Sequence, residues 1–120
     1  MRGGRRGRIV SAREVLMSTI AATVVEYTIR PEDAEALREG IATHLVPAAR
    51  GVAGYRGFLV LDQGEGKRLA VVVFDSIEQA RAARGPISGA AEAHGVHALM
   101  AVRRGGATGT AIVADGIFAR

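Results

Sequence analysis

Few side chains of this sequence can exchange protons or bind a polar ligand. His44 is the first candidate for a general base, because an imidazole exchanges protons near neutral pH and His44 lies three residues after Ile41, at the edge of an apolar helical stripe. Tyr27 and Tyr55 are the only tyrosines, and each combines an apolar ring with a hydroxyl that can donate a hydrogen bond to a ligand oxygen. These three residues are the core of a candidate site.

Two charged residues extend it. Glu26 and Arg56 lie within segments that have strand character, where a charge must face a cavity, a partner chain or an opposite charge. Either an ion pair across a subunit interface or the anchoring of an anionic substrate explains them. Structural explanations also exist for the other three: a surface or hydrogen-bonded role for His44, and core packing with the hydroxyl in water for Tyr27 and Tyr55.

Several kinds of site are not expected. The chain has no cysteine, which excludes disulfides, thiolate catalysis and cysteine-ligated metals. His94 and His97 have a spacing that could chelate a metal, but the only other histidine is the distant His44; we expect this pair at a solvated, frayed helix end. No glycine-rich phosphate motif is present. We therefore predict neither a metal nor a cofactor.

The positive charge of the chain is concentrated at its start. Residues 1–16 carry five arginines and one glutamate, whereas residues 17–120 carry equal numbers of basic and acidic groups. We expect a Gly/Arg-rich leader over 1–16, disordered or arising from an upstream start site, and one domain over 17–120. The alternative is that the leader binds the phosphates of a nucleic acid, in which case deleting residues 1–16 would abolish that binding. We do not expect nucleic-acid binding by residues 17–120, because their basic and acidic groups are equal in number. A secretory signal is not expected either, because polar residues interrupt its apolar segment.

The first half of the domain reads as a strand and a helix. Residues Ala21–Ile29 are β-branched and aromatic, with alternating faces. Pro31 then suits the first position of a helix, which the stripe Ala34, Leu37, Ile41, Leu45 and Ala48 continues for about four turns. Pro47 should kink or end the last turn.

The second half predicts two further strands, a broken helix and a last strand. Strands are expected over Tyr55–Asp62 and Arg68–Asp75, joined by a polar turn. Ser76 and Gln79 suit a capping box, and Gly85-Pro86 should interrupt the helix that follows. Residues 103–106 read as a flexible connection, and Thr108–Phe118 as the fourth strand.

This β-α-β-β-α-β order predicts an α+β, ferredoxin-like fold, in which a four-stranded antiparallel sheet carries two helices on one face. The unbroken apolar run Leu69–Phe74 places apolar side chains on both faces of the sheet. Phe58, Val60 and Val113 add to one face or the other. Because a bare apolar face is typical of an interface, we predict a homodimer in which two sheets pack face to face.

Three segments carry a resemblance to a known family. Thr23–Ala36, Val46–Asp62 with Gly54-Tyr55-Arg56-Gly57-Phe58, and Leu69–Gln79 with Phe74-Asp75-Ser76 resemble the dimeric α/β-barrel superfamily, and within it the antibiotic biosynthesis monooxygenase (ABM) domains. The resemblance covers about residues 21–118 and implies a small bacterial, cytoplasmic protein. The many arginines beside a single lysine also suggest a GC-rich genome.

The resemblance implies a cofactor-independent monooxygenase acting on a small planar phenolic or quinol compound. Its haem-degrading branch relies on an asparagine and a tryptophan, which this chain lacks. We expect His44 as the base and Tyr27, Tyr55, Arg56 and Glu26 as substrate-binding residues, around a pocket between sheet and helices lined by Leu37, Ile41, Leu59 and Val73. The alternative is a non-catalytic ligand-binding or assembly module with the same fold.

Overall fold

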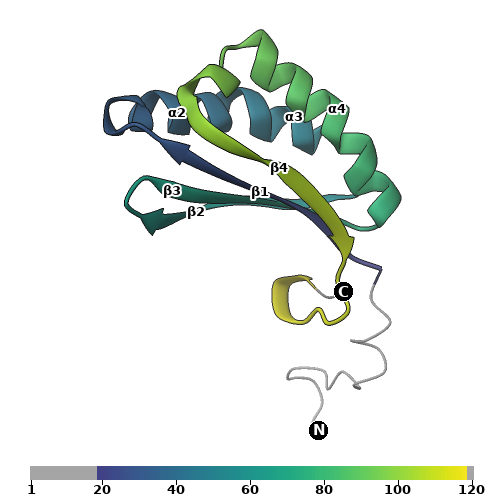
Figure 1. Cartoon of the computed structure of the whole chain (residues 1–120). Helices are drawn as coiled ribbons and strands as arrows, with labels where there is room; N and C mark the ends of the chain where they lie inside the picture. The colour runs from purple at the N-terminus through teal and green to yellow at the C-terminus, as the bar shows by residue number, and fades with distance from the viewer. Residues whose placement is uncertain (1–18, 119–120) are drawn as a thin grey trace, which may run out of the picture.

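The computed structural model describes residues 19–118, which form a four-stranded sheet with helices packed on one face (Figure 1). The predicted leader, residues 1–16, lies outside the described residues. The elements are β1 (Ala21–Ile29), η1 (Pro31–Asp33), α2 (Ala34–Gly40), η2 (Ile41–Leu45), α3 (Val46–Arg50), β2 (Tyr55–Gly64), β3 (Lys67–Phe74), α4 (Ile77–Ala93), η3 (His97–Leu99), β4 (Met100–Thr110) and η4 (Gly116–Phe118). The strand order is β2-β3-β1-β4, and all pairs are antiparallel. The predicted ferredoxin-like fold is confirmed.

β1 has the predicted bounds and lies between β3 and β4. Its odd-numbered residues, among them Val25, Tyr27 and Ile29, face the helices, and the even-numbered residues face away. The same alternation divides β3, where Val72 and Phe74 pack under the helices while Val71 and Val73 lie on the opposite face. Apolar side chains therefore occupy both faces of the sheet, as predicted.

The first helical segment begins at Pro31 and continues beyond Pro47 to Arg50. At η2 the backbone widens into one π-helical turn, in which the Val46 N–H donates to the Ile41 carbonyl. A proline has no N–H and crowds the carbonyl four residues earlier, and a wider turn just before it accommodates both effects. The helical segment therefore continues through Pro47, whereas the sequence predicted an end or a kink there.

α4 starts at the predicted cap and continues where an interruption was expected. The Gln79 N–H donates to Ser76 Oγ at 3.2 Å, as in the first half of a capping box. The expected break at Gly85-Pro86 is wrong, because α4 is continuous from Ile77 to Ala93. Pro86 is on the exposed side of the helix, where water solvates the carbonyl that loses its intrahelical donor.

The fourth strand is the main error of the sequence prediction. β4 spans Met100–Thr110. It includes residues 103–106, which were predicted to be a flexible connection, and it ends before Val113, which was predicted to lie in the strand. Val24 pairs with Ala107 and Glu26 with Arg104, so β4 contains one extra residue, a β-bulge. A larger residue would be crowded beside it, because a Cβ at Gly106 would lie 3.2 Å from Val25 Cγ2. A bulged edge strand tolerates a sequence of low β propensity because it pairs on one side only.

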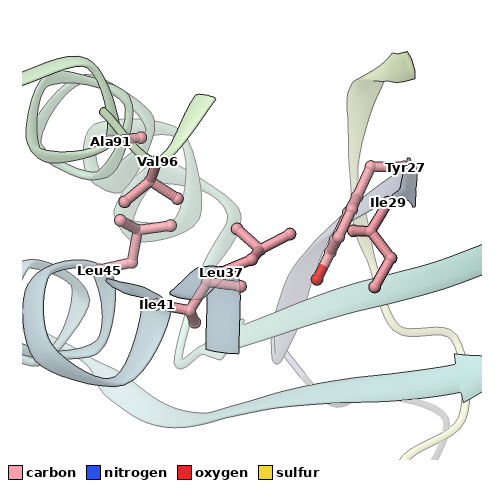
Figure 2. Packing of buried hydrophobic residues seen from close by; sticks show 7 residues of the cluster. All are labelled: Tyr27, Ile29, Leu37, Ile41, Leu45, Ala91 and Val96. Carbon is pink, nitrogen blue, oxygen red and sulfur yellow. The ribbon is translucent and has the colours of Figure 1, made fainter. Parts of the chain in front are cut away.

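The main core lies between the sheet and the helices. One cluster joins β1, the first helical segment and α4: Tyr27, Ile29, Leu37, Ile41, Leu45, Ala91 and Val96 (Figure 2). On the other face of the sheet, Leu59, Leu61 and Val102 are 40%, 48% and 56% exposed. A small cluster of Ile20, Val73 and Ala114 covers part of that face. Within residues 19–118, no helix has the length and apolar character needed to cross a membrane.

Candidate functional site

A cavity of about 270 Å³ lies between the sheet and the helices. Its interior is apolar and is formed by side chains from β1, β2, β3, η2 and α4: Val25, Phe58, Val72, Ile41, Leu45 and Ile87. The volume is just below the roughly 300–1,000 Å³ of typical small-molecule sites. It suits a compact ligand of one or two rings.

The pocket is where the sequence places it, but its predicted walls are only partly right. Ile41 lines the cavity, whereas Leu37 is packed into the neighbouring core cluster. Leu59 and Val73 belong to the opposite face, because they lie on the odd-numbered side of β2 and β3 with Val71. Hydrophobicity alone does not say which of two apolar faces the helices cover.

Tyr27 supplies a polar atom in the interior. The residue is 2% exposed, and its hydroxyl forms no well-aligned hydrogen bond among the described residues. Figure 2 shows the ring extending from β1 toward Leu37 with the hydroxyl at its tip. Burial raises the pKa of the Tyr27 phenol, and the positive charge of Arg68 and its approach to the hydroxyl as a donor both oppose that rise. The hydroxyl stays protonated at neutral pH and can donate to a ligand oxygen.

The opening of the cavity is marked by its exposed lining residues. Arg84 and Ser88 are one turn apart on α4, and Arg103 lies on β4. No aspartate or glutamate belongs to the lining, and neither arginine forms an ion pair within residues 19–118. The mouth between α4 and β4 is therefore cationic.

His97 is the ionisable imidazole of this cavity. The turn after α4 uses Gly95, whose φ is +71°, and buries Val96, whose N–H donates to the Ala91 carbonyl at 2.8 Å. This anchored turn directs His97 to the lining. Burial lowers the pKa of His97, and the positive charge of Arg103 lowers it further, while Glu92 acts in the opposite sense. A neutral imidazole at pH 7 can accept a proton.

His44, the predicted base, lies outside the cavity lining. Its ring stacks on that of His94, with ring centroids 3.7 Å apart and planes within 5° of parallel. The pair connects η2 to the C-terminal end of α4. His94 is exposed, as expected for a helix end, but His97 is not the frayed residue that the sequence suggested.

The remaining predicted residues are spread around the fold. Of these, Tyr27 alone lines the cavity. Tyr55 packs edge-on against Phe74, with ring centroids 6.0 Å apart. Arg56 is paired with Asp75 at 3.3 Å, which joins the start of β2 to the end of β3. Glu26 is exposed on the face away from the helices.

Sequence reasoning missed three cavity residues: His97, Arg84 and Arg103. A usable signal for His97 was present, since it follows the helix by a short glycine turn and precedes an apolar pair. The arginines gave no such signal, because their role depends on how β4 approaches α4. Among residues 19–118 no group of three or more histidine, aspartate or glutamate side chains could hold a metal ion.

No family model matches the chain, and no curated protein matches its sequence. Solved structures do match. A protein from Chloroflexus aurantiacus that is classed with the antibiotic biosynthesis monooxygenases is 18% identical, with a TM-score of 0.60, over 82% of this chain and 98% of its own.

Two further structures agree. SnoaB, a cofactor-independent oxygenase from Streptomyces nogalater, is 16% identical with a TM-score of 0.62, over 78% of this chain and 94% of its own. A protein of unknown function from Nitrosomonas europaea is 19% identical with a TM-score of 0.66, over 81% and 93%. At these identities the likeness concerns the fold. The chain thus has a ferredoxin-like α+β fold, and this fold is similar to that of these solved structures.

Proposed function

We propose that this protein is a cofactor-independent oxygenase of a small planar phenolic compound, which binds in the cavity between the sheet and α4. The observation that carries the proposal is that one apolar cavity is lined both by His97, whose lowered pKa favours the neutral imidazole, and by Tyr27 with its buried hydroxyl. The shared fold with SnoaB supports the same class of reaction.

The reaction needs little from the protein. An ionised phenol is electron-rich enough to reduce dioxygen itself. At an activated CH₂ of the same ring system, two C–H bonds break, one C=O bond forms, and the second oxygen atom leaves as water with the two hydrogens. The substrate carbon supplies all four electrons, so that no external reductant is consumed.

The residues then have distinct roles. His97 accepts the phenolic proton and returns it as water leaves. Tyr27 donates a hydrogen bond that orients a ring oxygen. The apolar walls exclude water, which protects the reactive carbanion-like ring from premature protonation. His44 has no place in this scheme, because it does not line the cavity.

Oxygen uptake on a panel of one- and two-ring phenols that carry an activated CH₂ group, such as hydroxylated 2-tetralones, tests the proposal. The wild type should consume one dioxygen per product, and His97→Gln should lower kcat by about 10²–10⁴-fold, as for the loss of a general base. His44→Ala is the matched control and should retain activity. Equal losses in both variants, or no turnover of any panel member by the wild type, would refute the proposal.

A non-catalytic binding module is the second candidate. It is favoured by the lining itself, which is mainly apolar and contains one proton acceptor. Ligand binding without oxygen uptake would select this alternative.

We further propose that a second copy of the chain covers the open face of the sheet. Leu59 and Leu61 on β2 and Val102 on β4 are exposed there, and leaving each large apolar side chain in water forgoes up to about 1.5–3 kcal/mol. A two-fold axis brings the same patch of each subunit together. Sedimentation equilibrium at micromolar concentration should report twice the chain mass; a monomer would refute the pairing.

A further inference from the structure

We propose that the natural ligand is an aromatic acid, a compact ring system carrying a carboxylate, which places its ring in the cavity and its carboxylate at the mouth. The inference rests on the proposed function only for the location of the ligand. It concerns binding, and it holds whether or not the bound compound is oxygenated.

The positive charge of the cavity lining is the first indication of an anionic ligand. Arg84 from α4 and Arg103 from β4 bracket the opening, and the lining contains no carboxylate to neutralise them. Among residues 19–118, Arg30, Arg38, Arg56 and Arg68 have an acidic partner and the other arginines do not, but of the unpaired ones only Arg84 and Arg103 line the cavity. Two unpaired guanidinium groups beside an apolar cavity are suited to an oxyanion, which an arginine can bind with two parallel hydrogen bonds.

His97 strengthens the same conclusion. It lies within reach of the Arg103 charge, which holds its pKa down. A bound carboxylate would reverse that effect, because an opposite charge favours the protonated imidazole. Glu92 is the acidic group whose charge reaches His97, and it does not belong to the lining.

The register of the sheet places a second polar group, the Tyr27 hydroxyl, where it can contact the ligand. Tyr27 and Arg103 are directly opposite one another on β1 and β4, so that their side chains enter the cavity from neighbouring positions. The Tyr27 hydroxyl forms no well-aligned hydrogen bond among the described residues, so it retains the capacity to bind a ligand oxygen. A ligand with a hydroxyl or carbonyl oxygen besides its carboxylate would satisfy both groups, which indicates a hydroxyaryl carboxylate.

The test compares two probes that differ in charge, 1-hydroxy-2-naphthoate and 1-naphthol, titrated anaerobically into the wild-type protein and followed by probe fluorescence. The acid should bind at least tenfold more tightly than the naphthol. Arg84→Gln/Arg103→Gln should lower the affinity for the acid at least tenfold and leave the naphthol affinity unchanged. Arg103→Lys, which keeps the charge, should recover part of the loss.

Arg81→Gln is the matched control, because Arg81 is an exposed arginine of α4 outside the lining. It should leave both affinities unchanged, and far-UV circular dichroism should verify that every variant folds. Equal affinity of the two probes, binding of neither, or an equal effect of Arg81→Gln would overturn the inference. Since no oxygen is present, a failure of the oxygenase proposal would be seen separately, in oxygen uptake.

Discussion

Replacing Tyr27 by phenylalanine should stabilise the fold and weaken the site. The Tyr27 hydroxyl is buried, and among the described residues it forms no well-aligned hydrogen bond, although Arg68 lies close enough to act on it. Burying a hydroxyl without a partner costs about 1–3 kcal/mol, whereas the phenylalanine ring keeps the apolar contacts. Tyr27→Phe should therefore raise the free energy of unfolding by about 1–2 kcal/mol. In a domain of this size each kcal/mol corresponds to roughly 3–6 °C in Tm.

Urea denaturation followed by far-UV circular dichroism measures this change, since the chain has no tryptophan to report by fluorescence. The same variant should bind 1-hydroxy-2-naphthoate more weakly. Tyr55→Phe is the matched control: its ring packs at the edge of Phe74 outside the cavity, and we expect a change within about 0.5 kcal/mol. If Tyr27→Phe loses more than 1 kcal/mol of stability, the hydroxyl has a structural partner and the reasoning fails.

Four more outcomes are expected. Because the pKa of His97 is lower in the folded than in the unfolded chain, the unfolded chain binds a proton first as pH falls, and wild-type stability should decrease below about pH 6.5. His97→Gln should reduce this decrease, measured as the difference between the urea midpoints at about pH 7.5 and 5.5. The same difference in the variant and the wild type would contradict this expectation. Leu61→Asp on the open face should yield a folded monomer in sedimentation equilibrium, and an unaltered dimer mass would argue against the pairing. Leu37→Ala should lower the free energy of unfolding by about 2–5 kcal/mol, since Leu37 is fully buried; a loss below 1 kcal/mol in urea denaturation would be inconsistent with that burial. Pro86→Ala should raise it by up to about 3 kcal/mol, because α4 regains an exposed hydrogen bond; a fall would show that the proline is needed.

Local pattern was sufficient for most of the framework. Alternation of apolar residues defines β1, a proline at the first position starts the helical segment at Pro31, and Ser76 caps α4 as predicted. Each of these signals acts between residues a few positions apart, where steric and hydrogen-bond preferences are readable from the sequence. The element order then restricts the topology to one sheet with both helices on the same face.

Tertiary structure decided the parts that matter for the site. Gly85-Pro86 is a helix breaker by local preference, yet α4 continues through it because the apolar face of the helix packs on the core. β4 lies eight residues earlier than predicted, since pairing with β1 and a bulge at Gly106 outweigh its weak strand propensity.

The candidate site follows from those same long-range contacts. Sequence reasoning chose His44 for its place on a helical stripe, but the fold stacks it on His94 and turns His97 toward the cavity. Arg103 meets Tyr27 only through the register of β4 against β1. The sequence alone determined which elements form and in what order, because those preferences are local. Which side chains share a cavity depends on contacts between residues up to about eighty positions apart in the chain, and these exist only once the sheet and helices have packed.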